Sequence, residues 1–243
     1  MQITRIGSGV HAVTCDAASW VLLSDGHDLT VIDGGYPGDA DRLVESIVRI
    51  GHQPQDVRGV LLTHAHVDHL GGVVPLLART DAPLLMHPLE VAAALGHHRE
   101  QATPVDVAVR AWRPRVARWA LHVVAAGGAG EVLAPRARAF PHPGALDLPG
   151  RPVPVHTGAH TSGHCGYHLP SAGVLVTGDV VVTGHPLSTR TGPQLLPGFF
   201  AHEHARLDAA LAAFEPLPAE VIAPGHGAPW HGSPDEAVAL ARA

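Results

Sequence analysis

The chain has 243 residues, of which 46% are apolar and 16% are charged, so it can bury a full hydrophobic core and is not a disordered chain. Its formal net charge is −6, with 22 acidic residues against 16 basic ones that are all arginine, and this balance disfavours a nucleic-acid partner. No apolar run reaches the roughly 18 residues that a membrane span needs, so we expect no membrane partner.

The cysteines and the N-terminal segment bear on the cellular compartment. Cys15 and Cys165 are far apart and form no C-x-x-C pattern, which disfavours a disulfide framework. The opening segment MQITRIGSGVHAV lacks a charged start followed by an apolar stretch and a cleavage site. We therefore expect a cytoplasmic protein.

The first third of the chain predicts strands, then a helix, then further strands. The segments GVHAV, SWVLLS and LTVID are typical of short antiparallel strands separated by turns. Residues 40–50 place Leu43, Ile47 and Ile50 at helical spacing. VRGVLLTH and LLMHP then predict buried strands, with a helix start at LGGVVPLLART between them. This order indicates a layered α/β protein.

The pattern changes between about residues 88 and 143, where two helical segments are interrupted at Pro114. Trp112, Val116 and Trp119 fall on one side of the second segment. Core packing is the favoured interpretation of such an aromatic stripe, and an apolar wall over a substrate pocket is the alternative. We expect one domain over residues 1–243 with a helical insertion at about 88–143.

The second half repeats the order of strand, polar loop and strand. RPVPVH, GVLVTGD and AEVIAPGHG each predict an apolar strand that leads into a loop with a histidine or an aspartate. A helix is predicted from about His202 to Phe214, and GSPDEAVALARA predicts a short final helix.

The segment LLTHAHVDHLGG, residues 61–72, carries a potential metal site at the end of a buried strand. His64 and His66 are two residues apart and can turn their rings the same way, while Asp68 and His69 follow at the start of a helix. Zinc prefers imidazole nitrogen and carboxylate oxygen, so one short loop can supply ligands to two adjacent metals. In a chain with 20 histidines this motif alone would be only suggestive.

Three further segments place similar groups after strands. His164 lies in the Gly-flanked turn of GAHTSGHCGYH, Asp179 in VLVTGDVVV and His226 in EVIAPGHG. His160 and His168 flank the turn, and we expect them to support the site or to lie on the surface.

Together, THAHVDH, TSGH, TGD and PGHG resemble the ordered motifs of the metallo-β-lactamase fold hydrolases, and the early VIDGG resembles the first Asp-Gly motif of that family. The resemblance spans essentially the whole chain. It implies an α/β fold built as a four-layer αββα sandwich, and a hydrolase with two zinc ions per chain, iron or manganese being alternatives. The ligands that it implies are His64, His66 and His164 for one metal, Asp68, His69 and His226 for the other, and Asp179 as the bridge.

The chemistry of such a site agrees with hydrolysis. Two metals can share a hydroxide, and one of them can polarise a carbonyl oxygen. Asp68 is the candidate catalytic residue because its carboxylate can orient that hydroxide. Asp33, in VIDGG, is a candidate acceptor for a ligand imidazole.

The resemblance leaves the substrate open, and a small-molecule ester, thioester or lactone is expected. Glyoxalase II-like enzymes add a C-terminal helical region, whereas here only 17 residues follow His226. N-acyl homoserine lactone lactonases, an alternative, commonly carry Tyr where this chain has Val182. Exported β-lactamases typically lack the bridging Asp. Four arginines of the insertion fit a solvated helix face better than an anion site, namely Arg110, Arg113, Arg115 and Arg118.

Two other classes use the same fold. A mononuclear iron dioxygenase acting on persulfides would share the first ligand set, but the residues for a second metal are usually depleted there. A non-catalytic binding protein would have lost ligands, and none is lost here. The sequence does not predict an oligomeric state.

Overall fold

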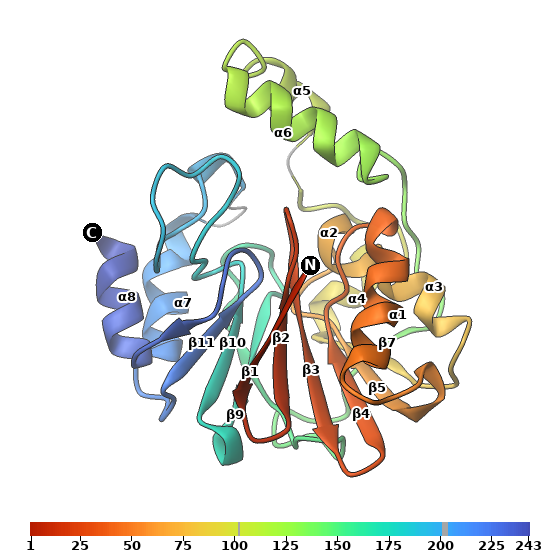
Figure 1. Ribbon diagram of the computed structural model, residues 1–243. Coiled ribbons are helices and arrows are strands. Elements are labelled where there is room, and N and C mark those ends of the chain that lie inside the picture. The colour runs from red at the N-terminus through yellow and green to blue at the C-terminus, as the bar shows by residue number, and fades with distance from the viewer. Residues whose placement is uncertain (102, 201–203) are drawn as a thin grey trace.

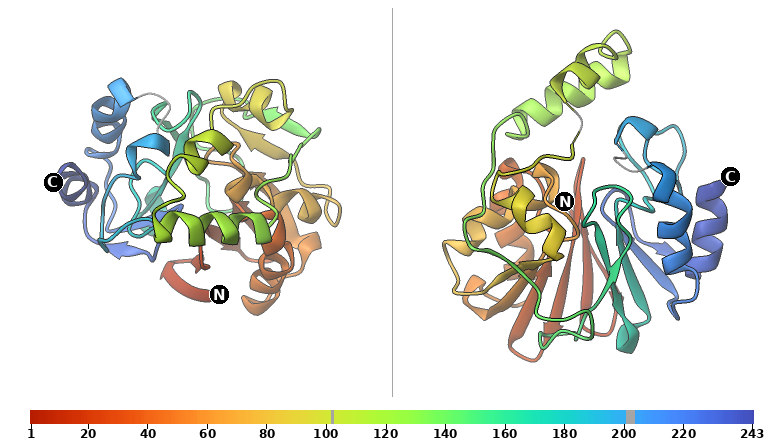
Figure 2. Two further views of the ribbon diagram at one scale, coloured as in Figure 1. Left: turned by 90° about the horizontal axis from the view of Figure 1, so that it is seen from above. Right: turned by 180° about the vertical axis from the view of Figure 1, so that it is seen from behind.

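The chain folds into two β-sheets that pack face to face and carry helices on their outer faces (Figures 1 and 2). The computed structural model describes residues 1–101, 103–200 and 204–243. The order of layers is helix, sheet, sheet, helix, which confirms the predicted α/β four-layer sandwich.

The first sheet has seven strands in chain order. Strands β1 to β4 are antiparallel neighbours, and β4 to β7 are parallel. The predicted strands are confirmed as β2 to β6. Strand β7 lies in the Gly- and Pro-rich stretch for which we expect loops mixed with short strands, whereas β1 was not predicted. The bounds are β1 (Gln2–Gly7), β2 (Val10–Thr14), β3 (Ser19–Asp25), β4 (Asp28–Ile32), β5 (Val57–Leu61), β6 (Leu84–Met86) and β7 (Ala137–Ala139).

The second sheet has the strand order β12-β11-β10-β9-β8. Only β10 and β11 are parallel, and the remaining pairs are antiparallel. The bounds are β8 (Val153–His156), β9 (Cys165–Leu169), β10 (Val174–Gly178), β11 (Val221–Pro224) and β12 (Trp230–His231).

Helices cover the two outer faces (Figure 1). The first sheet carries α1 (Ala40–Arg49), α2 (Val67–Leu70), α3 (Val73–Leu77) and α4 (Pro88–Ala94). The second sheet carries α7 (Leu207–Phe214) and α8 (Pro234–Arg242). The start predicted for α7 at about His202 lies outside the described residues.

Three apolar clusters lie between the four layers of secondary structure. Strand β3 contributes side chains to two of them, and for this reason its sequence is apolar throughout. Trp20 and Leu22 pack in the cluster that faces α1 and α3, whereas Val21 and Leu23 pack in the cluster between the sheets. Side chains alternate along a strand, so a strand buried on both faces needs a continuous apolar run. A third cluster joins the second sheet to α7 and α8.

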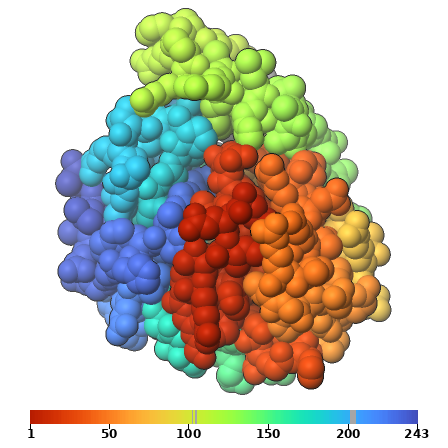
Figure 3. Space-filling view, in the orientation of Figure 1, coloured from red at the N-terminus to blue at the C-terminus, as the bar shows by residue number. Residues whose placement is uncertain are grey.

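Helices α5 (Pro104–Ala108) and α6 (Pro114–Ala125) project above the body (Figures 1 and 3). Val116 and Trp119 are buried, but the side chain of Trp112 is 76% exposed, so the prediction that all three are core residues is wrong for Trp112. The reason is that Trp112 lies in the turn before α6, where the guanidinium of Arg113 stacks on its ring.

Over the described residues, we find no helix that is both long and apolar enough to span a membrane. The cytoplasmic location stays a prediction.

Candidate metal centre

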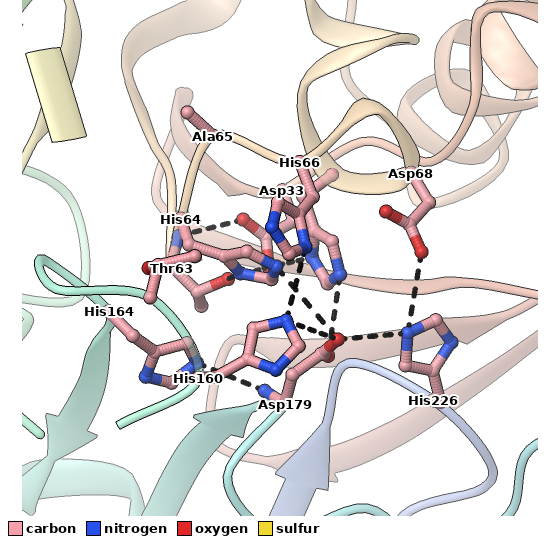
Figure 4. Close-up of polar contacts among 12 residues, drawn as sticks. Asp33, Thr63, His64, Ala65, His66, Asp68, His160, His164, Asp179 and His226 are labelled. Atoms are coloured by element: carbon pink, nitrogen blue, oxygen red, sulfur yellow. Dashed lines mark hydrogen bonds and ion pairs between the residues drawn. The ribbon is translucent and has the colours of Figure 1, made fainter. Parts of the chain in front are cut away.

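The candidate metal centre lies where strands of both sheets end (Figure 4). Asp33 follows β4, and the loop with His64 and His66 follows β5. In the second sheet, Asp179 follows β10 and His226 follows β11. Since β4 is parallel to β5 and β10 is parallel to β11, each pair presents its carboxyl ends at one edge.

Three histidines, His64, His66 and His160, form the first group of potential ligands. One nitrogen from each ring lies within 4.8 Å of the others. Nδ1 of His66 and Nε2 of His160 are 3.1 Å apart, and the ring centroids of His64 and His160 are 4.6 Å apart. Imidazole nitrogens that converge in this way suit one transition-metal ion.

The second group consists of Asp68, His69 and His226, whose ligand atoms also lie within 4.8 Å of one another. Nε2 of His226 is 3.5 Å from Oδ2 of Asp68. His69 and His226 are buried, whereas the Asp68 side chain is 16% exposed. Asp68 is therefore the member of this group that solvent or substrate can reach.

Asp179 lies between the two groups (Figure 4). Its Oδ2 atom is 3.5 Å from Nε2 of His160 and 3.1 Å from Nε2 of His226, while Oδ1 is 3.3 Å from Nε2 of His69. A Cβ atom at Gly225 would lie 2.3 Å from Oδ1, so the loop after β11 can approach this carboxylate only with glycine there. The carboxylate thus has one oxygen beside each group.

Hydrogen bonds fix which nitrogen of His64 and His69 faces inward. The Thr63 hydroxyl donates to Asp33 at 2.8 Å, so its oxygen accepts from Nδ1 of His64, 3.0 Å away. Nδ1 of His69 donates to the same Asp33 oxygen at 2.9 Å, as predicted for Asp33. In both histidines Nε2 therefore presents a lone pair to the centre.

Backbone carbonyls orient the rings of His66 and His226. Nε2 of His66 donates to the carbonyl of Glu100 at 2.7 Å, and Nδ1 of His226 donates to the carbonyl of Ala17 at 2.6 Å. The remaining nitrogens, Nδ1 of His66 and Nε2 of His226, present lone pairs to the centre. Such outward donors are what metal-ligating imidazoles require.

Several of the inward atoms have no hydrogen-bond partner among the described residues. Within the described part of the chain, Nε2 of His64, Nε2 of His69 and Oδ1 of Asp179 are buried and accept or donate no hydrogen bond. Leaving a buried polar atom unpaired costs about 1–3 kcal/mol, so such a cluster needs an occupant. The donor set of imidazole and carboxylate fits zinc or a similar divalent ion.

The charges of the centre also favour a cation. Burial, and then the neighbouring imidazoles, hold the pKa of His64 well below its usual value, and burial lowers the pKa of His160 as well. Burial alone would lower the pKa of His69 and His226, but the nearby carboxylates, Asp179 first, outweigh it and raise both. The carboxylates therefore attract positive charge to this edge, and a bound cation would supply it in place of the two protons.

Glu90 joins the two loops that carry the first group. It is 2% exposed, and its carboxylate accepts hydrogen bonds from the backbone N–H of Ala65 at 2.8 Å and of Gly163 at 3.1 Å. It also accepts from the hydroxyl of Thr161. The sequence analysis did not single out Glu90, because a lone Glu at the start of a helix carries no motif.

Ring nitrogens of His64, His66 and His160 converge, whereas His164, the ligand expected from the TSGH motif, is not part of this group. Nδ1 of His164 is 2.7 Å from the Thr157 hydroxyl, and its Nε2 accepts from the backbone N–H of Asp179 at 3.0 Å. Both ring nitrogens are thus occupied. T-x-x-H occurs twice, four residues apart, as TGAH and TSGH, and the first copy was the signal that could have identified His160.

An aromatic wall leads from the insertion to the centre. The ring of Trp119 in α6 is 6.1 Å from the ring of His185 and 5.4 Å from that of Phe200. The ring of His185 is in turn 5.1 Å from that of His226. Trp119 therefore overhangs the centre, which favours the alternative interpretation for this residue.

Comparisons with known proteins agree with this geometry. The profile of the family described as the metallo-beta-lactamase superfamily matches residues 13–226. The chain is 25% identical over 237 residues to the probable metallo-hydrolase YflN of Bacillus subtilis (strain 168), covering 92% of this chain and 86% of that protein. It is 36% identical to an N-acyl homoserine lactonase of Bacillus thuringiensis, but over only 63 residues, 26% of this chain and 23% of that protein.

Solved structures share the fold. The Rm3 metallo-beta-lactamase matches with a TM-score of 0.71 and 18% sequence identity, covering 100% of this chain and 91% of that one. At this identity the likeness concerns the fold and leaves the substrate open.

Proposed function

The chain belongs to the metallo-beta-lactamase superfamily and is a metal-dependent hydrolase, and on that premise we propose that it binds two zinc ions and hydrolyses a small ester, thioester or lactone. The observation that carries the proposal is the set of inward lone pairs described above. Three of these atoms, on His64, His69 and Asp179, are buried without a partner in the described residues.

We assign the ligands by group. His64, His66 and His160 would hold one ion, Asp68, His69 and His226 the other, and Asp179 would bridge them. The support for the bridge is that its two oxygens lie beside different groups. His164 is left out because both of its ring nitrogens are hydrogen-bonded.

When bound, the two ions would lower the pKa of a water molecule and polarise the scissile carbonyl. The protein's own contribution is orientation and protonation. Asp68, the more exposed of the two carboxylates at 16% against 2% for Asp179, would accept a hydrogen bond from the attacking water and aim it. Burial, then Asp68 and Asp179, raise the pKa of Tyr36, so its phenol stays protonated and can donate a hydrogen bond beside Asp68.

The lactonase alternative is supported by the short match to the Bacillus thuringiensis lactonase. Against it, Val182 is buried and its backbone pairs with Gln194, so this position supplies no hydroxyl to a substrate. The persulfide dioxygenase alternative needs only one metal, and the intact second group of Asp68, His69 and His226 counts against it.

A substrate screen tests the proposal. Zinc-loaded protein is assayed against lactone, thioester, ester and β-lactam panels, with chelator-stripped protein as the control. We expect hydrolysis in at least one of the first three panels, lost on stripping and restored by zinc. The Asp68→Asn variant should lose most of the turnover while keeping its fold by circular dichroism. Oxygen consumption with a persulfide and a single iron would contradict the proposal.

A further inference from the structure

A cavity of about 310 Å³ lies between α6 and the loop that follows β10. In the space-filling view, the insertion, in green, lies above two parts of the body, one coloured cyan and the other red to orange (Figure 3). None of the proposed metal ligands lines the cavity. The lining residues are Asp16, Arg115, Arg118, Trp119, His122 and Pro186.

Two series of ring contacts connect residues of the cavity wall to the metal centre. On one side, Trp119 contacts His185, whose ring is 5.1 Å from that of the proposed ligand His226. On the other side, the ring of His122 is 6.4 Å from that of Tyr36, which lies beside Asp68. A group bound in the cavity would therefore contact Trp119 and His122, whose ring neighbours lie beside the proposed ligands His226 and Asp68.

One face of α6 turns toward the cavity. Arg115, Arg118, Trp119 and His122 are spaced at i, i+3, i+4 and i+7, so they share a helix face. Burial of Trp119 and Val116 fixes the rotation of the helix. The Arg115 guanidinium also donates to the carbonyl of Ser188 at 3.4 Å, which holds its side chain across to the β10 loop.

The two arginines of this face have no acidic partner. Among the described residues, no carboxylate lies within 4.0 Å of Arg115 or Arg118, whereas Arg99 pairs with Glu131 and Arg110 lies 4.0 Å from Asp106. Among the described residues that line the cavity, the only carboxylate is that of Asp16, which lies 3.6 Å from Arg42. The cavity wall therefore carries unbalanced positive charge.

We propose that this cavity binds an anionic group of the substrate, a carboxylate or a phosphate, through Arg115 and Arg118. The proposal rests on the proposed function and adds that the hydrolysed ester, thioester or lactone carries a negative charge at its far end. Planar guanidinium groups match the oxygens of both anions. Arg115 and Arg118 are exposed, as expected for a solvated helix face, and the proposal adds an anionic ligand to that face.

Matched substrates test the proposal. The kcat/KM of zinc-loaded protein is measured on an aryl ester of glutarate with a free carboxylate and on its neutral carboxamide isostere, and on a matched phosphate-bearing ester. We expect at least one anionic ester to be preferred over the neutral one by about tenfold or more, since a hydrogen bond to a charged group contributes about 1.5–3 kcal/mol. The Arg115→Gln/Arg118→Gln double variant should lose this preference and keep its rate on the neutral ester.

Two single variants serve as matched controls. Arg113→Gln removes an arginine of the same segment that stacks on Trp112 and does not line the cavity, so it should leave the preference unchanged. Asp16→Asn removes the one carboxylate of the wall and should increase the preference for the anionic ester. An equal loss on both esters in the double variant would overturn the proposal.

A binding measurement separates this proposal from the proposed function. Glutarate and glycerol phosphate are titrated calorimetrically into wild-type protein and into the double variant. Binding of either anion that the double variant loses, without hydrolysis of any ester, would support the cavity and contradict the proposed function. Hydrolysis without a preference for either anionic ester, together with no binding of either anion, would contradict the cavity alone.

Discussion

Asp33 and His69 are hydrogen-bonded to each other at the metal centre, with Oδ2 of the carboxylate 2.9 Å from Nδ1 of the ring. The other carboxylate oxygen accepts from the backbone N–H of Thr63 at 2.8 Å. Asp33 itself adopts a left-handed backbone conformation with φ of 63°, which Asp and Asn tolerate better than most residues. One buried aspartate thus anchors the β5 loop and orients an imidazole.

Replacing Asp33 with Asn tests this role without disturbing the backbone. The Asn side chain has the shape of Asp, but its NH₂ group cannot accept the hydrogen bonds that the carboxylate accepts from Thr63 and His69. The ring of His69 therefore loses the contact that orients it. We expect metal affinity to fall about 10–100-fold, measured by competition with a chromophoric chelator.

Asp28→Asn is the matched control, because Asp28 pairs with Arg58 on the surface and lies away from the centre. It should leave metal affinity unchanged. Equal affinity of Asp33→Asn and wild type would contradict the orienting role.

Most of the fold was predictable because apolar periodicity reports burial directly. The alternation of Trp20, Val21, Leu22 and Leu23 between two clusters is the physical source of the SWVLLS signal. Short strands were expected in the Gly- and Pro-rich stretch that holds β7, but the bounds of β7 could not be predicted, because three residues, two of them exposed, are too few to show a period. Trp112 was misplaced because helical spacing was extended across the turn before Pro114.

The candidate site was predictable except in the turn where two histidines occupy equivalent positions of repeated T-x-x-H segments. His64, His66, Asp68, His69, Asp179 and His226 are brought together by strand ends that the sequence indicated. His160 and His164 could not be told apart from spacing alone, since each ends a T-x-x-H segment of the same turn. Only the hydrogen bonds of His164 distinguish them.

Metal content distinguishes His160 from His164. We expect His160→Ala to lose one zinc ion per chain after dialysis against a weak chelator, because an imidazole of the first group is removed. His164→Gln should keep both ions while unfolding at a lower denaturant concentration, because its hydrogen bonds to Thr157 and Asp179 are altered. The reverse result, with full metal content in His160→Ala and a loss in His164→Gln, would restore the original assignment.

Glu90→Gln tests the link between the two loops of the first group. All three partners of Glu90 donate to it, so an amide NH₂ group would leave one of them unpaired. We expect a loss of about 1–3 kcal/mol in the free energy of unfolding, measured by urea denaturation.

The control for Glu90 is Glu131→Gln, which changes an exposed glutamate paired with Arg99 on the surface. Its unfolding midpoint should match that of wild type. If the unfolding midpoint of Glu90→Gln also matched that of wild type, the hydrogen bonds of Glu90 would not contribute to the free energy of unfolding.

His185 should make the metal-free protein less stable in acid. Burial, then His226, lower the pKa of His185 to about 3, against 6.5 in the unfolded chain. Below pH 6.5 the unfolded state binds a proton at His185, whereas the folded state does not bind it until the pH approaches 3. The free energy of unfolding is therefore unaffected by His185 above pH 6.5 and falls as the pH decreases from 6.5 toward 3.

In the His185→Gln variant, the free energy of unfolding should fall less steeply between pH 6.5 and 4.5, by up to about 1.4 kcal/mol per pH unit. His27→Gln, in an exposed turn, should follow the wild-type curve. Parallel curves for wild type and His185→Gln would show that His185 does not resist protonation.

The central claim is a two-metal hydrolytic centre built from His64, His66, Asp68, His69, His160, Asp179 and His226. The most direct measurement is the metal content of purified protein by mass spectrometry, taken together with ester or lactone hydrolysis in the same sample. We expect about two zinc ions per chain and a rate that rises with occupancy of both. One iron per chain, with oxygen consumption and no hydrolysis, would contradict it.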